Sequence, residues 1–213
     1  LSLDWSILQD AFQRVIDITG EYYKAAAEDF ERLRNITSDI SLLQEATKAW
    51  YEGQSLSSLA AEYSVSEELL AAVIHSAVKP FLTAYSEALS GLVEQERWRR
   101  GYCPICGGKP NFAFLDKERG ARWLLCSRCD AQWLFQRLKC PYCGTEDQND
   151  LAYFTDDKGL YRLYVCQKCQ SYLKAIDLRQ TEEELLLPLE RVLTADMDRQ
   201  GQEKGYMGGG QIP

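Results

Sequence analysis

The sequence predicts an α+β protein in which an all-α N-terminal domain is followed by two small cysteine-containing modules and a C-terminal helix. Three observations lead to this prediction. Apolar residues recur at helical spacing through the first hundred residues, which contain no cysteine. All eight cysteines lie between residues 103 and 169, each in a C-x-x-C pair. The segment that holds them is a tandem repeat of short β segments and turns.

Residues 1–100 are expected to form one α-helical domain. Gly20 and residues 35–38 interrupt the helical pattern, and Pro80 is expected in the first turn of a last helix that runs to about Arg100. We expect five or six helices packed as a bundle. The apolar residues that set the period near the N-terminus are Trp5, Leu8, Phe12, Val15, Ile16, Tyr22, Tyr23, Ala26, Phe30 and Leu33.

Residues 55–77 have the rhythm of a helix-turn-helix, and Ser66 is placed to cap its second helix. A DNA-recognition helix needs cations for the phosphates, but this stretch contains no Lys or Arg. We therefore interpret it as a packing motif. The single histidine, His75, is expected to be a surface or packed residue of this helix and not a catalytic group.

The repeat divides the following segment into a first module, residues 101–139, and a second module, residues 140–180. The motif CPICGG at 103–108 recurs as CPYCG at 140–144, and CSRCD at 126–130 recurs as CQKCQ at 166–170. In each module a β-hairpin joins the two cysteine pairs and a third strand follows. The expected strands are residues 111–115, 121–125, 132–137, 151–155, 160–165 and 172–176.

Two C-x-x-C pairs joined by a hairpin can enclose one tetrahedral ion, as in zinc ribbons and in rubredoxin-type iron sites. Each copy of the repeat carries a complete set of ligands, so we expect one ion in each module. Gly107 and Gly144 are suited to the turn that follows a cysteine pair. The expected metal ligands are Cys103, Cys106, Cys126 and Cys129 for the first ion, and Cys140, Cys143, Cys166 and Cys169 for the second.

The four-thiolate sites favour a structural role for the two ions. A closed cage leaves no open coordination position, so we assign no catalytic residues and do not expect an enzyme. Modules of this size cannot fold on core burial alone, which makes the ions candidate folding elements. Two questions stay open at this point. The spacing does not decide between iron and zinc, and C-x-x-C thiols can also exchange electrons or disulfides.

The charge distribution disfavours a nucleic-acid-binding zinc ribbon. The net charge is −8, and residues 1–100 carry 9 Lys and Arg against 16 Asp and Glu. Residues 101–180 carry 12 against 9, but two four-thiolate sites that each hold a divalent ion would cancel that excess. A phosphate-binding surface needs a basic footprint, so no nucleic-acid partner is expected.

Residues 181–213 are expected to form a C-terminal helix and a mobile tail. Thr181 opens a capping box with the glutamates that follow it, although Pro188 can shift the helix start. The helix should end near Gly201, and residues 205–213 are expected to be the mobile part. Paired cysteines, no apolar run near 18 residues and no secretory pattern in residues 1–10 predict a cytoplasmic protein without membrane insertion.

Three segments together resemble the formate dehydrogenase accessory protein FdhE family: RWRRGYCPICGGKP, LLCSRCDAQWLFQRLKCPYCG and VCQKCQSYLKAIDLR. Besides the cysteines, the resemblance includes Trp98, Gly101, Trp133 and the Tyr172-Leu173-Lys174 run. It covers residues 95–180 and extends more weakly into the last helix. The N-terminal helical part looks shorter than in long family members.

The resemblance implies a helical domain followed by two rubredoxin-like modules, with the eight cysteines as metal ligands and iron as the usual metal. It also implies a cytoplasmic maturation factor that binds the catalytic subunit of formate dehydrogenase. The alternatives are a rubredoxin-like redox or thiol-exchange protein that acts on the same client and, less favoured, a nucleic-acid-binding zinc ribbon.

Overall fold

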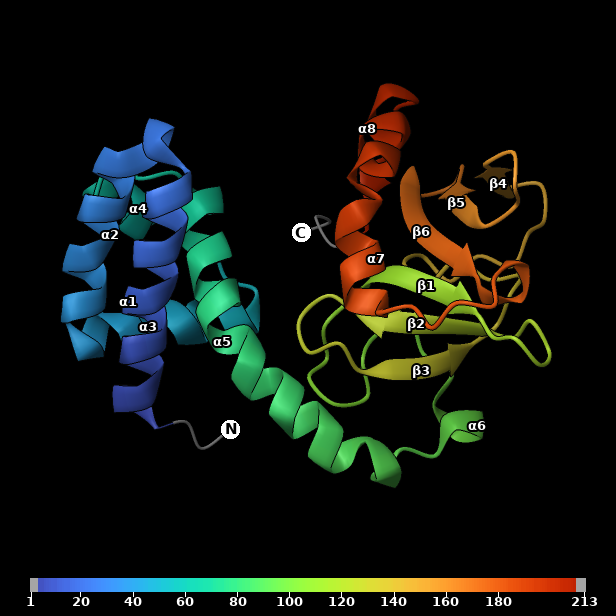
Figure 1. Ribbon diagram of the computed structural model, residues 1–213, viewed down its shortest axis with the longest axis horizontal. Helices are drawn as coiled ribbons and strands as arrows, with labels where there is room; N and C mark the ends of the chain where they lie inside the picture. The colour runs from blue at the N-terminus through green and yellow to red at the C-terminus, as the bar shows by residue number, and fades with distance from the viewer. Residues whose placement is uncertain (1–3, 210–213) are drawn as a thin grey trace. The chain divides into compact units, whose positions relative to one another are not determined.

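A computed structural model describes residues 4–209 of the chain. The chain divides into two compact units, one up to Leu82 and one from Thr83. Helices form the first unit, and the second contains a seven-stranded mixed sheet with helices after it (Figure 1). The predicted fold class is therefore confirmed. The division between the units falls inside one continuous helix, Glu67–Leu89.

The first unit is a helical bundle in which the first and third α-helices begin at aspartate side-chain caps. Asp4 accepts hydrogen bonds from the backbone of Ser6 and Ile7, and Asp39 caps the third helix in the same way. His75 stacks on Trp50, with ring centroids 5.6 Å apart. The helical elements are α1 (Trp5–Tyr22), the 3₁₀ turn η1 (Lys24–Ala26), α2 (Ala27–Ser38), α3 (Ile40–Glu52), α4 (Ser57–Glu62) and α5 (Glu67–Leu89).

Pro80 lies inside α5 and not in the first turn of a separate helix, so that prediction is wrong. Buried Val78 and Leu82 continue the apolar stripe past the proline, and this packing outweighs the lost hydrogen bond. The expectation that no segment approaches a membrane span also needs correction. Among the described residues, Glu67–Leu92 passes that test by length and composition only, and 39% of its most apolar window is buried inside the protein.

Six strands of the two modules form one continuous sheet in the order β3-β2-β1-β6-β5-β4. Each predicted strand is present within one to two residues. The repeat predicted two similar hairpin units, and both are found as antiparallel β1–β2–β3 and β4–β5–β6. The strands are β1 (Pro110–Leu115), β2 (Arg122–Cys126), β3 (Gln132–Phe135), β4 (Leu151–Thr155), β5 (Tyr161–Cys166) and β6 (Ser171–Asp177).

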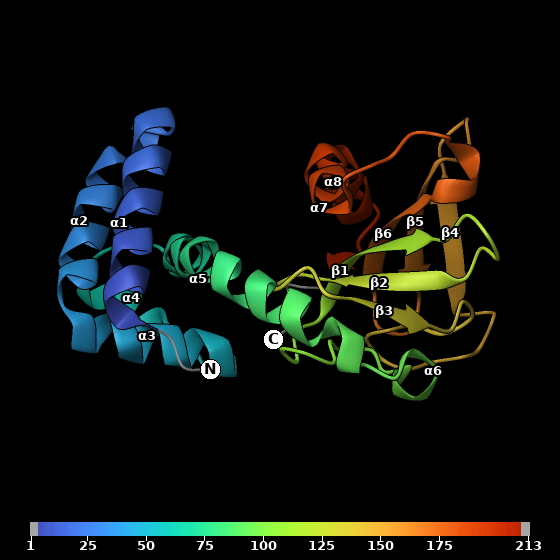
Figure 2. The same ribbon diagram turned by 60° about the horizontal axis from the view of Figure 1, so that its bottom comes forward.

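The two modules are joined by a parallel pairing between β1 and β6, from Phe112 opposite Lys174 to Leu115 opposite Asp177. Phe112 and Phe114 of the first module and Ile176 of the second share one buried cluster. The two modules therefore share one hydrophobic core and are not independently packed domains. Short elements flank them: η2 (Ser90–Leu92), α6 (Gln95–Trp98) beside β3, and η3 (Leu178–Gln180) after β6 (Figure 2).

The C-terminal segment covers the sheet and returns to it. The last helix starts later than the capping box at Thr181 predicts, and it is split into α7 (Leu187–Leu193) and α8 (Ala195–Glu203). Pro188 lies in the first turn of α7, where its missing N–H is tolerated. Lys174 of β6 fixes this arrangement, because its buried ammonium donates to the carbonyls of Arg191 and Thr194 and to Asp198.

The prediction of a mobile tail from Gly205 is wrong for residues 205–209. Strand β7 (Met207–Gly208) pairs parallel with the start of β6, and Tyr206 is buried against Leu163, Val165 and Tyr172. Burial of an aromatic ring and strand pairing together hold this segment. Residues 210–213 of the predicted tail lie outside the described residues.

A buried ion cluster closes the end of β6. The Asp177 side chain is fully buried and accepts hydrogen bonds from Arg162 at 2.6 Å and from Arg179 at 2.7 and 2.8 Å. Burial alone would raise the pKa of Asp177. The hydrogen bonds and charges of the two arginines outweigh burial and hold this pKa below its ordinary value.

We expect Asp177→Asn to lower the free energy of unfolding at pH 7 by about 2–4 kcal/mol, since it removes the charge of the fully buried carboxylate that pairs with Arg162 and Arg179. Because its folded-state pKa is lowered, ionised Asp177 stabilises the folded protein at pH values above its unfolded-state pKa of about 3.9. This stabilisation is lost as the pH falls through the folded-state pKa. The gap between wild type and variant should therefore narrow below about pH 4. Urea unfolding from pH 7 to pH 3 measures this, and a gap independent of pH would contradict it.

Candidate metal centres

The eight cysteines gather in two clusters, each composed of the four that the sequence assigns to one ion. Within each cluster the four Sγ atoms lie within 4.8 Å of one another. Sulfurs that belong to different C-x-x-C pairs approach to 3.4 and 3.5 Å in the first cluster and to 3.7 Å in the second. A tetrahedral ion with metal–sulfur bonds of about 2.3 Å needs sulfurs roughly 3.8 Å apart, so both clusters fit such an ion. Ligation itself stays a prediction.

The C-x-x-C turns are closed by backbone hydrogen bonds. In the first cluster the Cys103 N–H donates to the Gly108 carbonyl at 2.8 Å, and the Gly107 N–H donates to the Cys103 carbonyl at 3.1 Å. Backbone N–H groups also point at sulfur, including that of Gly108 at 3.4 Å from the Cys106 Sγ and that of Arg128 at 3.4 Å from the Cys126 Sγ. Such donors favour the thiolate, which is the form that binds a metal.

Each of the four turns places the residue after its second cysteine in the left-handed region. Gly107 and Gly144, with φ of 71° and 74°, occupy two of these positions, as the sequence predicts. Asp130 and Gln170 occupy the other two, with φ of 55° and 51°. The sequence analysis missed this role because neither residue is a glycine. The signal was available in the repeat, since both residues follow a C-x-x-C pair.

The pKa values of the thiols in the first cluster diverge. Hydrogen bonds from Cys103, Cys106 and Cys126 lower the pKa of Cys129, whereas hydrogen bonding to the other thiols raises the pKa of Cys126. In the second cluster burial raises the pKa of Cys140. Four thiolates this close repel one another without a cation, so a divalent ion must displace the remaining protons when it binds.

The two clusters differ in exposure. All four cysteines of the first cluster are buried, whereas Cys143 of the second is exposed and Cys169 is half-buried. The Ser171 hydroxyl lies 3.3 Å from the Cys169 sulfur. An ion in the second site would therefore be the more accessible to chelators and oxidants.

Residues outside each module complete its site. For the second site, the Tyr142 hydroxyl donates to the Pro110 carbonyl of the first module at 3.1 Å. A β-carbon at Gly101 would overlap the backbone carbonyl of Pro141, so glycine is required there. For the first site, Arg191 of α7 pairs with Asp130 at 3.0 Å.

The two tryptophans noted in the sequence hold the segment that enters the first module. The Trp98 indole N–H donates to the Tyr102 carbonyl at 2.9 Å, and the Trp133 indole N–H donates to the Arg100 carbonyl at 2.7 Å. Trp133 is fully buried. Both interactions fix the chain just before Cys103, the first predicted ligand.

A helical region followed by a mixed sheet with two four-cysteine clusters defines a two-module ribbon protein with room for one ion in each module. Comparison with known proteins agrees with this class. Residues 102–137 match the family model described as "FdhE, central domain". The chain is 37% identical over 151 residues to a protein FdhE homolog of Aquifex aeolicus, covering 68% of this chain and 52% of that protein. The chain belongs to the FdhE family.

Two further comparisons extend the likeness. The chain is 24% identical over 172 residues to protein FdhE of Escherichia coli, covering 78% of this chain and 55% of that protein. The crystal structure of the FdhE protein from Pseudomonas aeruginosa superposes with a TM-score of 0.53 at 18% identity, covering 95% of this chain and 92% of that chain, which shows the shared fold. The chain spans about half the length of the curated relatives it matches.

We expect the full chain to bind two equivalents of Co(II), each with thiolate-to-cobalt absorption in the near ultraviolet. Cys106→Ser and Cys143→Ser should each reduce the bound metal to one equivalent, because each removes one of four ligands from a different site. A chelator should remove cobalt first from the second site, where two cysteines are partly exposed. Binding of a single ion by the wild type, or loss of both ions in either variant, would contradict the assignment.

A second prediction concerns the left-handed position after Cys169. Gln170→Gly should give a metal-loaded protein about 1 kcal/mol more stable than Gln170→Ala, because both lack the glutamine side chain and only glycine adopts this backbone without strain. Denaturant unfolding of the two variants measures the difference. Lys168→Gly and Lys168→Ala, one residue before Cys169, are the matched controls and should not show this gain for glycine.

Proposed function

We propose that the chain is a cytoplasmic maturation factor that binds the immature catalytic subunit of a formate dehydrogenase. Membership of the FdhE family supports this proposal, because the resemblance of the cysteine segments implies that client. The factor would hold the subunit before assembly and would not act as an enzyme. Two four-cysteine clusters support the second point, since four thiolates on one ion leave no position for a substrate.

The exposed apolar face of α7 is the observation that favours a protein client. Leu187 and Glu190 face the sheet and are buried, whereas four apolar side chains around them point away from it. A cluster of apolar side chains on a solvent-exposed surface is typical of a protein–protein interaction site. We define the α7 patch as Leu186, Leu189, Val192 and Leu193, which are 72%, 50%, 64% and 66% exposed.

In this proposal iron or zinc would occupy the two four-cysteine sites. Cys103, Cys106, Cys126 and Cys129 would hold one ion, and Cys140, Cys143, Cys166 and Cys169 would hold the other. The ions would cross-link segments of the sheet and the turns between them, which supplies folding free energy that modules of this size lack.

A redox role is the second candidate, and the exposure of Cys143 favours it. An ion ligated by a solvent-exposed thiolate can exchange electrons with a docked partner more readily than a fully enclosed one. Reversible bleaching of visible absorption when the iron-loaded protein takes up one electron would support this role. A protein isolated from its host with two zinc ions and no iron would count against it.

The proposed function is tested by capture of the client. Tagged full-length protein should retain the cofactor-free catalytic subunit of formate dehydrogenase from the same organism. The double variant Leu189→Asp with Leu193→Asp should reduce this capture at least tenfold, because it places two charges in the α7 patch.

Leu138→Asp is the matched control, since Leu138 is 61% exposed but lies outside the patch, and it should leave capture unchanged. Circular dichroism and metal content verify that the variants fold. Failure of the wild type to retain the subunit would refute the proposed function. Equal loss in the control variant would refute the role of the patch.

A further inference from the structure

Arg122 is a buried cation without a carboxylate partner in the described part of the chain. It begins β2 in the first module and is 3% exposed. Its Nη2 donates to the backbone carbonyls of Gln136 and Lys139, and its Nε has no hydrogen-bond partner. Arg162 and Arg191, whose side chains are 14% and 13% exposed, differ from it, since Arg162 pairs with Asp177 and Arg191 with Asp130.

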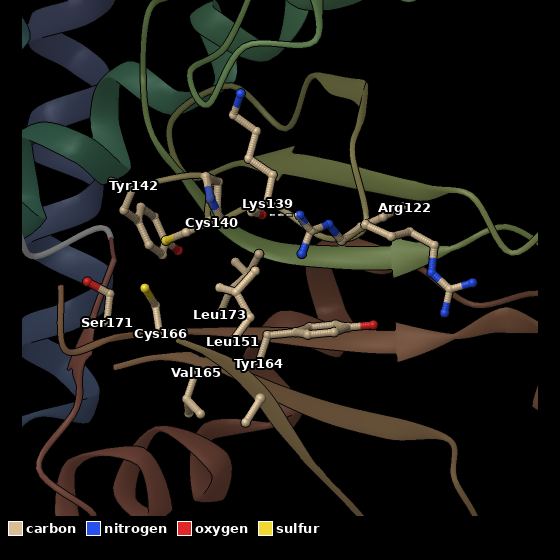
Figure 3. A pocket seen from close by; sticks show the side chains of 13 residues that line it. Arg122, Lys139, Cys140, Tyr142, Leu151, Tyr164, Val165, Cys166, Ser171 and Leu173 are labelled. Carbon is tan, nitrogen blue, oxygen red and sulfur yellow. Dashed lines mark hydrogen bonds between the residues drawn. The ribbon is translucent and has the colours of Figure 1, made fainter. Parts of the chain in front are cut away.

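The Arg122 side chain reaches from the first module to the segment that leads into the second metal centre. Its guanidinium lies 5.2 Å from the ring centroid of Phe135 and 5.4 Å from that of Tyr164. It borders a small cavity of about 30 Å³ that is also lined by Cys140 and Cys166, two predicted ligands of the second ion (Figure 3). One of the two carbonyls that it binds belongs to Lys139, the residue directly before Cys140.

The Arg122 guanidinium and the second four-thiolate site carry opposite charges, so each can stabilise the other. Four thiolates around a divalent ion carry a net charge of −2, and around a ferric ion −1, so a buried site is stabilised by a nearby cation. A guanidinium remains protonated at neutral pH and is costly to bury without a negative charge. Backbone carbonyls and aromatic faces offset only part of that cost. The four-thiolate site next to Cys140 supplies the missing charge.

We propose that Arg122, carried by the first module, is the buried counter-charge of the metal centre in the second module. The same strand ends at Cys126, a predicted ligand of the first site, so β2 connects the two centres. Metal binding in the second module then depends on a residue of the first, although every predicted ligand is local. This inference concerns the ion and its surroundings, and it holds whether or not the proposed client is correct.

The rival explanation is that Arg122 only anchors the backbone before Cys140 through its hydrogen bonds. Two substitutions separate the explanations. Arg122→Gln keeps a donor for a carbonyl but removes the charge, whereas Arg122→Lys keeps the charge on a different donor. If the charge of Arg122 is what matters, Arg122→Lys should hold the second metal ion about as tightly as the wild type. An anchoring effect alone does not depend on charge.

The test uses the full-length protein loaded with two equivalents of Co(II) and titrated with a chelator of known affinity. Arg122→Gln should release one equivalent at a chelator concentration at least tenfold lower than the wild type requires, and the other equivalent should be unchanged. Arg122→Lys should lie within threefold of the wild type. In the Cys143→Ser background, where only the first site remains, Arg122→Gln should change cobalt release by less than twofold.

Iron provides a readout that a merely structural role would not move. In protein loaded with iron, loss of a nearby positive charge favours the ferric state of the second site. At a fixed potential near its midpoint, the ferrous-to-ferric ratio should fall at least threefold in Arg122→Gln and remain near wild type in Arg122→Lys. Arg162→Gln is the control, because it removes a buried arginine from the strand that carries Cys166 but that arginine pairs with Asp177.

Circular dichroism and the retained first-site cobalt establish whether Arg122→Gln is folded. If the variant does not fold, the comparison of Arg122→Lys with wild type decides, and a tenfold weaker second site in the lysine variant would overturn the proposal. Equal cobalt release in Arg122→Gln and wild type would also overturn it. So would equal changes in the Gln and Lys variants, which would assign Arg122 to backbone anchoring only.

Discussion

The parallel pairing of β1 with β6 is the interaction on which the rest of the second unit depends. Each module has only three short strands, which bury a small core on their own. The pairing brings Phe112 and Phe114 into the same cluster as Ile176, and α7 closes this cluster with Leu187. Because β5 covers the other edge of β6, the central strand is paired on both sides and its charged residues are buried with partners.

This joining makes two sites of equal ligand content unequal in surroundings. The first site lies wholly inside the protein, and Arg191 of α7 supports the turn that ends at Asp130. The second site rests on the first module on one side, through Tyr142 and the close approach of Pro141 to Gly101, and is open at Cys143. A repeat in the sequence therefore fixes the donor set but not the dielectric, the solvent access or the nearby charges.

The local features of the fold could be predicted from the sequence because they depend on a few neighbouring residues. The strands, the glycines after two of the cysteine pairs and the grouping of cysteines by module all follow from the repeat. Features that depend on distant residues could not be predicted in this way. Nothing in the sequence near Tyr206 indicates that its ring is buried against β5 and β6. Likewise, nothing near Pro80 indicates that α5 continues past the proline because its apolar side is packed. The capping box at Thr181 was overridden in the same manner, since Pro188 and the buried Leu187 set the helix start.

Both candidate centres are completed by groups from outside their own module, and this links metal binding to assembly of the whole unit. Arg191 follows both modules in the chain yet donates to the Cys126 carbonyl and to Asp130 at the first site. Arg122 precedes the second module yet binds the carbonyl before Cys140. An ion that binds only the assembled arrangement stabilises that arrangement by its own binding free energy. The two sites thus act on a shared structure, and an ion bound at either one favours the sheet and the C-terminal helices.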